Sequence, residues 1–263
     1  MPFVMANGID LHYRESGSGP RAILFVHALG TSSRIWDAVA ARMDGERRCI
    51  RYDLRGHGQS TVTDGPYSLD LLAADLLGLM EALDIAKAVI CGVSIGGLIA
   101  QRAALDRPDR AEALILCDTG ARIGTPESWQ ERIRLVGARG LPDMAGDITA
   151  RWFSPDFRRT AGPLCDVLRA DLASMSAIGY IGACHALRDA NLSTDVGKIR
   201  IPTLVACGAE DIATPPAVAQ DLASLIPGAL EDVIPGAGHL PCVEAPDHLA
   251  RSIHHFLLEA KVA

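Results

Sequence analysis

Ser94 lies in a segment whose residue types and spacing suit a catalytic nucleophile. The segment Gly92-Val93-Ser94-Ile95-Gly96-Gly97 joins an apolar run to a predicted helix. Glycines on both sides of a serine permit a sharp strand-to-helix turn that exposes the hydroxyl. Glycine-serine turns are also common outside active sites, so the motif needs support from other residues. A hydroxyl near its ordinary pKa is a poor nucleophile and requires a base, together with an acid that orients the base.

His239 and Asp211 are the predicted base and acid. His239 lies in the last predicted strand-to-helix loop, directly after a glycine. Asp211 follows the predicted strand 202–207, which gives the chain order serine, acid, histidine. Glu210 and Asp118 also follow predicted strands, so they are alternative acids. The sequence therefore predicts a serine–histidine–aspartate set.

Other histidines fit the role of base less well. His12 is on the polar side of a predicted strand. His254 and His255 lie in the terminal helix, and we expect these two side chains to be exposed. His57 belongs to the loop 53–58, whose glycines indicate tight turns, and we expect this histidine to be structural. The final loop is thus the favoured place for the base.

Two backbone N–H groups are predicted to stabilise an oxyanion. Ile95 begins the helix after the nucleophile, so its N–H points toward the same place as the serine hydroxyl. The second donor should come from the loop 27–30, which follows the apolar run 22–26, and we assign it to Leu29. Donors of this kind serve acyl transfer, in which a tetrahedral oxyanion forms.

Strand and helix patterns alternate along most of the chain, and the candidate residues fall in the loops between them. Asn7-Gly8 is typical of a tight hairpin turn, after which Ile9, Leu11 and Tyr13 alternate with polar residues as in a half-buried strand. Later apolar runs are continuous, as expected of parallel strands covered on both faces. Such strands are predicted at 22–26, 49–52, 88–92, 114–117, 202–207 and 230–234, and helices at 35–43, 69–83, after 94, after 216 and at 246–258. The alternation predicts a mostly parallel sheet flanked by helices.

The alternation stops between about 122 and 190, where the pattern is helical and contains no clear strand. Thr125 and Pro126 begin this stretch with a capping hydroxyl and a proline at the first helical position. We therefore predict an α/β core formed by residues 1–121 and 191–263, with a helical cap formed by residues 122–190. The cap is inserted after the sixth strand.

The bulk composition excludes several function classes. The chain has 263 residues, of which 49% are hydrophobic and 22% charged, as is usual for a folded domain. The formal net charge of −7 offers no basic surface for nucleic acid or for an anionic membrane. No apolar stretch is long enough to span a bilayer, and the N-terminus lacks a signal-peptide pattern, so we expect a cytoplasmic protein. Nothing in the pattern indicates an oligomeric state.

Motifs for cofactors and metals fail on their context. The segment 17–22 nominally fits a dinucleotide fingerprint, but it contains proline and precedes a strand rather than a helix. There is no phosphate-binding loop motif, no zinc-protease motif and no cluster of metal-ligand residues. The seven cysteines include no C-x-x-C pair, and we expect them to be reduced and mostly buried. We therefore expect neither a cofactor nor a metal.

The whole chain resembles the α/β-hydrolase superfamily, from the loop 53–58 through the serine turn to Gly238-His239. Within it, the chain is most similar to the 3-oxoadipate enol-lactonases, which open an enol-lactone with water. The segments that carry this closer resemblance are 94–101, 117–129, 150–153 and 180–184. Cap sequences vary more than core motifs between subfamilies, so a match there is more informative about the substrate.

This resemblance implies the α/β-hydrolase fold and a serine hydrolase that converts 3-oxoadipate enol-lactone to 3-oxoadipate. One departure concerns the oxyanion loop, where those lactonases often carry Asn-Ser-Leu-Gly and this chain has His-Ala-Leu-Gly at 27–30. Because the donor is a backbone N–H, catalysis should survive the change. The identity of the substrate is less firmly implied than the reaction.

The lactone carries a carboxylate, for which a cap arginine could supply the cation. Arg132 and Arg134 in the first cap helix are candidates, as is Arg151, although such arginines often only solvate a helix face. Trp129 and Trp152 are predicted to contact the substrate as well, the first as a wall for the ring.

Other functions are compatible with the same residues. They include a broad carboxylesterase, a cofactor-free haloperoxidase-like hydrolase and a C–C bond hydrolase of aromatic meta-cleavage. A ligand-binding receptor on the same fold belongs to a different class. The complete triad argues against a receptor, because a pure binding site has no need for all three residues.

Overall fold

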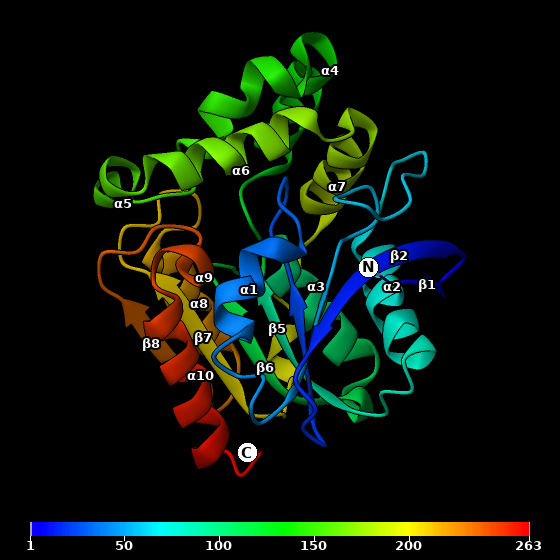
Figure 1. Ribbon diagram of the computed structural model, residues 1–263, viewed down its shortest axis with the longest axis vertical. Coiled ribbons are helices and arrows are strands. Elements are labelled where there is room, and N and C mark those ends of the chain that lie inside the picture. Colours follow the sequence, from blue (N-terminus) through cyan, green and yellow to red (C-terminus); the bar gives the residue numbers. More distant parts are fainter. Residues whose placement is uncertain (1, 263) are drawn as a thin grey trace.

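An eight-stranded sheet forms the centre of the structure, a computed structural model that describes residues 2–262 (Figure 1). The strand order is β1-β2-β4-β3-β5-β6-β7-β8, with antiparallel pairing at β1–β2 and β2–β4 and parallel pairing elsewhere. The strands are β1 (Phe3–Ala6), β2 (Ile9–Ser16), β3 (Ala22–Val26), β4 (Arg48–Tyr52), β5 (Ala88–Val93), β6 (Ala111–Cys117), β7 (Thr203–Gly208) and β8 (Leu230–Ile234). The predicted mostly parallel sheet is confirmed.

The carboxyl ends of the central strands meet at one edge of this sheet. Val26 of β3 lies beside Gly92 of β5, and Val93 lies beside Cys117 of β6. Strands β3, β5 and β7 are buried along their whole length, because helices cover both faces. Loops that follow these strands are therefore brought together, although they are far apart in the sequence.

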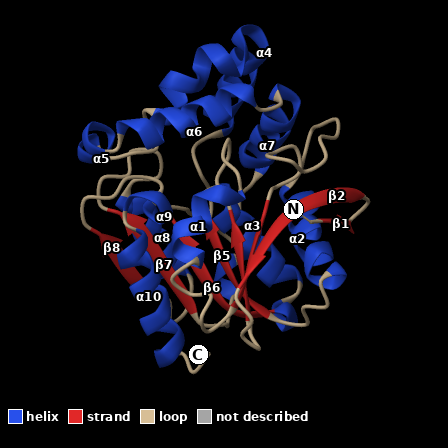
Figure 2. Cartoon of the chain, viewed as in Figure 1, coloured by secondary structure: helices blue, strands red, loops and turns tan. Residues whose placement is uncertain are grey.

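Helices cover both faces of the sheet, as Figures 1 and 2 show. Helices α1, α9 and α10 pack together on one face, and α2 and α3 pack together on the other. The helices around the sheet, which also include α8 against β7 and β8, are α1 (Asp37–Ala40), α2 (Leu69–Ala82), α3 (Ile95–Asp106), α8 (Pro216–Leu225), α9 (Pro241–Glu244) and α10 (Pro246–Glu259). The helix expected at 35–43 is shorter than predicted, since a 3₁₀ turn (Ser33–Trp36) precedes α1 and plain turns follow it.

A layer made only of helices lies above the carboxyl edge of the sheet (Figure 2). It consists of α4 (Pro126–Thr149), α5 (Pro155–Thr160), α6 (Gly162–Ser174) and α7 (Ala177–Asp189). The Thr125 hydroxyl accepts the Ser128 N–H (3.2 Å) and caps α4, as its sequence suggests. Helix α4 is kinked at Gly140, two residues before Pro142. These helices fall within the predicted cap, whose status as a separate unit stays a prediction.

His12 is buried although it lies on the polar side of its strand. Its side chain is buried, and the ring Nδ1 lies 2.8 Å from Asp53 Oδ2. The alternation of β2 predicts a polar face, but the loop that follows β4 covers that face: the His12 N–H donates to the Ser60 hydroxyl (3.0 Å). The ring Nδ1 therefore has its partner inside the protein, whereas the buried Nε2 has none among the described residues.

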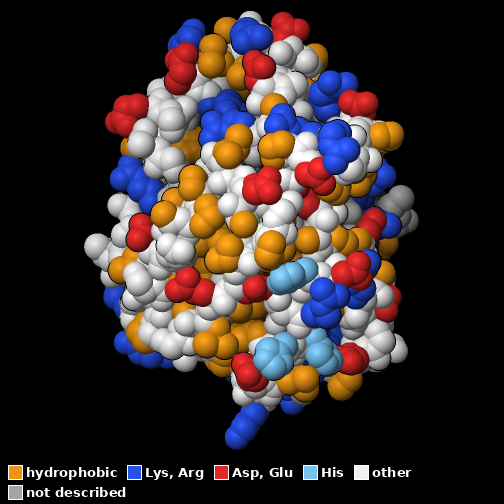
Figure 3. All heavy atoms as spheres, turned by 90° about the vertical axis from the view of Figure 1, so that its left-hand side faces the viewer, with side chains coloured by type: hydrophobic (Ala, Val, Ile, Leu, Met, Phe, Trp, Pro, Cys, Tyr) orange, Lys and Arg blue, Asp and Glu red, His pale blue; other side chains and the backbone are white. Residues whose placement is uncertain are grey.

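Charged side chains of both signs are dispersed over the face that Figure 3 shows, between areas of apolar side chains. The edge strand β8 leaves Leu230 and Val233 partly exposed. No helix among residues 2–262 is both long and apolar enough to cross a membrane.

Candidate active site

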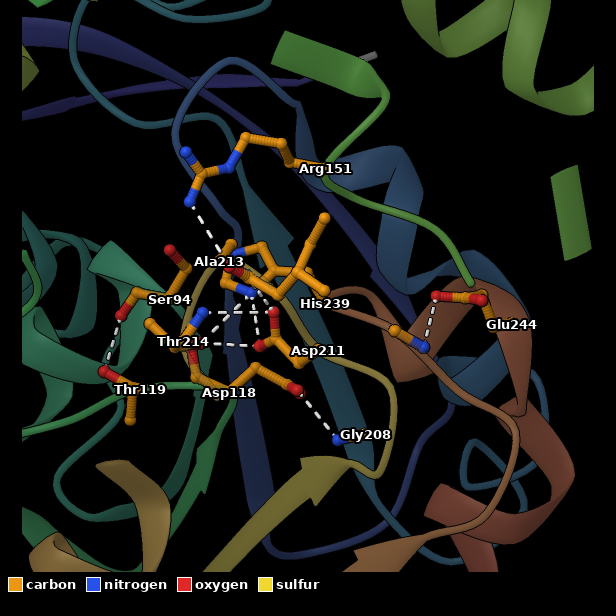
Figure 4. A network of polar contacts seen from close by, with 12 residues as sticks. Ser94, Asp118, Thr119, Arg151, Gly208, Asp211, Ala213, Thr214, His239 and Glu244 are labelled. Atoms are coloured by element: carbon orange, nitrogen blue, oxygen red, sulfur yellow. Dashed lines mark hydrogen bonds and ion pairs between the residues drawn. The ribbon is translucent and has the colours of Figure 1, made fainter. Parts of the chain in front are cut away.

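The predicted nucleophile lies at the sharp turn between β5 and α3. Ser94 has φ 58° and ψ −121°, a strained combination for a residue with a side chain. A Cβ on Gly92 would lie 2.2 Å from the carbonyl oxygen of Gly96, so a turn this tight requires glycine there. The Ser94 N–H donates to the Cys117 oxygen (3.0 Å), and the Thr119 hydroxyl donates to the Ser94 oxygen (2.8 Å; Figure 4). These bonds tie the strained turn to the end of β6.

The predicted acid and base lie next to each other after the last two strands. Asp211 follows β7 and His239 follows β8, and the distance from Asp211 Oδ2 to His239 Nδ1 is 2.7 Å (Figure 4). Asp211 also accepts hydrogen bonds from the Ala213 N–H (2.7 Å), the Thr214 N–H (3.0 Å) and the Thr214 hydroxyl (2.6 Å). The carboxylate is fixed by these donors, and the imidazole keeps Nε2 for another partner.

The electrostatic balance at Asp211 favours the ionised form. Burial alone would raise its pKa, but the charge of His239 and the hydrogen bonds from His239 and Thr214 outweigh burial and hold the pKa below its ordinary value. An ionised acid can orient the imidazole and stabilise an imidazolium. Thr214 was not among the residues predicted from the sequence. Its one signal is its position three residues after Asp211, where a threonine often bonds back to a loop aspartate.

Neither alternative acid is hydrogen-bonded to the base. Glu210 is exposed. Asp118 is buried, and its Oδ1 accepts the Gly208 N–H (2.8 Å). Within residues 2–262, Asp118, Asp211 and His239 form a group whose ligand atoms lie within 4.8 Å of one another, close enough to hold a metal ion. The sequence suggested no such cluster because its members are distant along the chain; the Asp211–His239 hydrogen bond already occupies two of them.

The predicted oxyanion donors have no competing partners. Among the described residues, the Leu29 N–H makes no hydrogen bond, and Leu29 lines the same cavity as Ser94. Ile95 is the first residue of α3, so its N–H has no acceptor within the helix. Both groups are therefore available to negative charge that develops beside Ser94.

Two buried histidines hold the loop that carries Leu29. His27 Nε2 accepts the Leu54 N–H (2.9 Å), and His57 Nε2 accepts the Gly30 N–H (3.2 Å). Because Nε2 is an acceptor in both rings, both are neutral with the proton on Nδ1. His57 thus has the structural role expected from its sequence context.

The buried His57 makes stability depend on pH. Burial, reinforced by the charge that a protonated His27 would carry, lowers the pKa of His57 to about 3, whereas an unfolded histidine has a pKa of about 6.5. As the pH falls below about 6.5, the unfolded chain binds a proton that the folded chain does not, so the free energy of unfolding should fall by a few kcal/mol toward pH 3. In urea denaturation, His57→Gln should show a shallower fall between pH 6 and 4, and His255→Gln, an exposed control, the parental slope. An unchanged slope for His57→Gln would contradict this role.

Ser94 and His239 line a cavity of about 200 Å³ beneath the cap helices. No hydrogen bond joins the Ser94 hydroxyl to His239 within residues 2–262, and contacts of this kind often tighten only once substrate binds. A second hollow of about 390 Å³ lies on the other side of the loop 27–32, against α6, and contains none of the predicted catalytic residues. The smaller cavity is therefore the candidate active site.

Three of the four predicted binding residues line this cavity. They are Trp129, Arg132 and Trp152. Arg134 does not reach it, because its guanidinium is paired with Glu131 on the exposed side of α4 (2.6 Å). Residues two apart point to different sides of a helix, so Arg132 and Arg134 cannot both face the cavity.

Two arginines contribute positive charge to the cavity wall. Arg132 Nη1 donates to the Tyr180 hydroxyl (3.2 Å), and Arg151, which also lines the cavity, donates from Nη2 to the Ile212 oxygen (3.3 Å). Neither arginine is paired with a carboxylate among the described residues. The cavity therefore offers unpaired guanidinium groups near the serine, which favours an anionic ligand.

Glu244 of α9 connects the loop that carries the base to the cap. Its Oε1 accepts the Gly238 N–H (2.9 Å), and its Oε2 accepts the Ser154 N–H (2.9 Å). The His239 N–H also donates to the Trp152 oxygen (2.9 Å). The loop of the base is thus hydrogen-bonded to the cap segment that carries Trp152, which lines the cavity. No motif marks Glu244, so sequence reasoning had no signal for it.

Comparisons with known proteins identify the family to which the chain is similar. Residues 21–246 match the protein family described as alpha/beta hydrolase fold. The chain is 37% identical to 3-oxoadipate enol-lactonase 2 of Acinetobacter baylyi, over 92% of this chain and 90% of that protein. It is 33% identical to 3-oxoadipate enol-lactonase 1 of the same organism, over 90% and 88% of the two chains.

Solved structures with a similar fold include an enol-lactonase and an esterase. The crystal structure of the enol-lactonase from Burkholderia xenovorans LB400 is similar with a TM-score of 0.95 at 35% identity, covering 98% of this chain and 100% of the other. A thermophilic esterase from Thermogutta terrifontis is similar with a TM-score of 0.92 at 31% identity, covering 98% of each chain.

Proposed function

The chain belongs to the α/β-hydrolase fold family and is, like the lactonases it resembles, a hydrolase; from that premise we propose that it opens 3-oxoadipate enol-lactone with water to give 3-oxoadipate. Ser94 is the nucleophile, His239 the base and Asp211 the acid. The N–H groups of Leu29 and Ile95 form the oxyanion hole. Residues 122–190 form the cap that closes the substrate cavity.

Acylation begins when Ser94 Oγ attacks the lactone carbonyl carbon and His239 Nε2 takes the hydroxyl proton. Asp211 holds the imidazole and stabilises the imidazolium. The N–H groups of Leu29 and Ile95 stabilise the oxyanion, each by about 3–4 kcal/mol. The bond from the carbonyl carbon to the ring oxygen then breaks. The ring oxygen receives the proton from His239, and the resulting enol tautomerises to a ketone, which drives ring opening forward.

Deacylation uses the same groups with water in place of the serine. His239 takes a proton from water, and the water oxygen attacks the acyl carbonyl carbon. The bond to Ser94 Oγ breaks, and the serine regains its proton from His239. The product leaves with a new carboxylate and a ketone, without any change in oxidation state.

The observation that carries the choice of an acidic lactone is the pair of arginines in the cavity wall. Arg132 and Arg151 line the same cavity as Ser94, and neither is paired with an acid within residues 2–262. The lactone side-chain carboxylate supplies that partner through charge-assisted hydrogen bonds. Trp129 and Trp152 give the cavity apolar walls for the ring.

Comparing 3-oxoadipate enol-lactone with p-nitrophenyl acetate tests the substrate assignment. We expect kcat/KM for the lactone to exceed that for the neutral ester by about 10²-fold or more, because only the lactone pairs with the arginines. Equal values for the two substrates would instead favour a broad carboxylesterase, the alternative that the similarity to the Thermogutta esterase supports. Failure to hydrolyse either compound would contradict the hydrolase mechanism itself.

Replacing Arg132 by glutamine tests the carboxylate site. A hydrogen bond to a charged group contributes about 1.5–3 kcal/mol, so KM for the acidic lactone should rise about 10–100-fold. KM for p-nitrophenyl acetate should change less than about threefold, since that ester carries no carboxylate. Arg134→Gln is the matched control, because Arg134 lies on the same helix but is paired with Glu131 outside the cavity. An equal rise for both substrates would argue against carboxylate binding by Arg132.

A further inference from the structure

Asp118 has a buried carboxyl group that the mechanism above does not use. It follows β6 directly, is fully buried and has a positive φ of 44°. Its Oδ1 accepts the Gly208 N–H, whereas its Oδ2 is buried and has no donor in reach among residues 2–262. An ionised oxygen in that position is costly. The cost is relieved if the carboxyl group carries a proton and donates it to a neighbouring acceptor.

Among the described residues, the charged groups around Asp118 offer no cation except the imidazole that Asp211 already holds. The titratable groups that face it are Asp211 after β7, His239 after β8, and the thiols of Cys117 (β6), Cys207 (β7) and Cys242 (α9). Two buried carboxyl groups this close do not both ionise readily. Burial first, and then the charge of Asp211 and a hydrogen bond with it, raise the pKa of Asp118 well above its usual range, while the pKa of Asp211 is lowered.

Thr214 also joins the two aspartates. Its hydroxyl lies 2.9 Å from the Asp118 carbonyl oxygen and 2.6 Å from Asp211 Oδ2. Figure 4 shows Asp118, Asp211 and His239 close together, and one carboxylate oxygen of each aspartate and one ring nitrogen of His239 lie within 4.8 Å of one another. Asp118 is therefore near the base as well as the acid, and it is the carboxyl group that remains in this cluster if the Asp211 side chain is removed.

We propose that the acid of this site is a pair of aspartates, in which protonated Asp118 donates a hydrogen bond to ionised Asp211 and replaces it as the partner of His239 when Asp211 is lost. This inference rests on the proposed function, because it assigns a role within the same serine hydrolase site. Asp118 is a positioning residue, since it acts on the base through Asp211. The pair carries one proton and one negative charge, so its net charge equals that of a single ionised aspartate.

The test compares the parent with Asp118→Asn, Asp211→Ala and the double variant, using p-nitrophenyl acetate. Asp118→Asn should lower kcat less than about tenfold, because the amide keeps a donor toward Asp211. Asp211→Ala should cost about 10²-fold, less than the roughly 10⁴-fold loss when a triad aspartate without a substitute is neutralised. In the Asp211→Ala background, Asp118→Asn should cost about 30-fold or more, because no carboxyl group is then left to orient His239.

The pH profile separates this role from a merely structural one. The acid limb of kcat/KM for Asp211→Ala should stay near that of the parent, whereas the limb of the double variant should move about one unit lower, because an imidazole without a carboxylate protonates less readily. Thermal unfolding verifies that each variant is folded, and Asp211→Asn replaces Asp211→Ala if the alanine variant is not. An equal cost of Asp118→Asn in both backgrounds, with no movement of the limb, overturns the proposal. A parent that hydrolyses neither ester nor lactone would instead overturn the proposed function.

Discussion

Replacing Ser94 by alanine is expected to lower turnover of ester and lactone by about 10⁴–10⁶-fold while the fold stays intact. The change removes one oxygen from a turn whose hydrogen bonds to Cys117 and Thr119 use only the Ser94 backbone. The oxyanion donors and the cavity are left in place, so some activity above the uncatalysed rate should persist. Steady-state kinetics with both substrates, together with thermal unfolding, measure the two parts of this expectation.

A matched serine provides the control for this variant. Ser224 lies on the outside of α8, and its hydroxyl donates to the Asp221 oxygen within the same helix (2.7 Å), so Ser224→Ala should keep parental turnover. A fluorophosphonate probe, which reacts with activated serines, should label the parent and the Ser224→Ala protein but not Ser94→Ala. Turnover by Ser94→Ala within tenfold of the parent would remove Ser94 as the nucleophile.

Elements buried on both faces could be predicted from the sequence with little error. β3 has the predicted bounds. Its five consecutive apolar residues match neither the alternation of a half-exposed strand nor the periodicity of a surface helix, so a strand buried on both faces is the remaining interpretation. The helix at 35–43 shows the limit of periodicity. Its apolar residues Ile35, Trp36 and Val39 are buried as predicted, but the spacing does not distinguish an α-helix from a 3₁₀ turn followed by a short helix.

The candidate site was predictable where chemistry restricts the residue type. A nucleophile on a glycine-flanked turn, an acid and a histidine each follow a strand, and loops after neighbouring parallel strands meet. The distances between such loops cannot be predicted from the local sequence. The contacts of the Thr214 hydroxyl with both aspartates, and the hydrogen bond from the Gly238 N–H to Glu244, depend on how strands far apart in the chain are placed in the sheet. The same limit applies to Arg134, because the sequence does not determine which side of α4 faces the cavity.

Gly208→Ala is expected to lower kcat/KM by about 10²-fold or more, although Gly208 contacts no substrate. A Cβ at this position would lie 2.0 Å from the Gly238 oxygen and 2.4 Å from the Ala237 oxygen, both of which are backbone atoms that cannot move alone. The loops after β7 and β8 must then separate, which pulls His239 away from Asp211. Overpacking of this kind should also lower the free energy of unfolding by about 1–3 kcal/mol.

Activity and stability must be separated for this variant, so kcat/KM is measured at a temperature where unfolding curves show both proteins fully folded. Gly146→Ala in α4 is the matched control, because a Cβ there meets no atom within 4 Å other than its own stretch of helix backbone. It should raise stability by up to about 1 kcal/mol through helix propensity and leave kcat/KM unchanged. If Gly208→Ala keeps parental kcat/KM, the approach of the two loops does not position the base, and the 2.7 Å contact between Asp211 and His239 must be held by the donors around Asp211 alone.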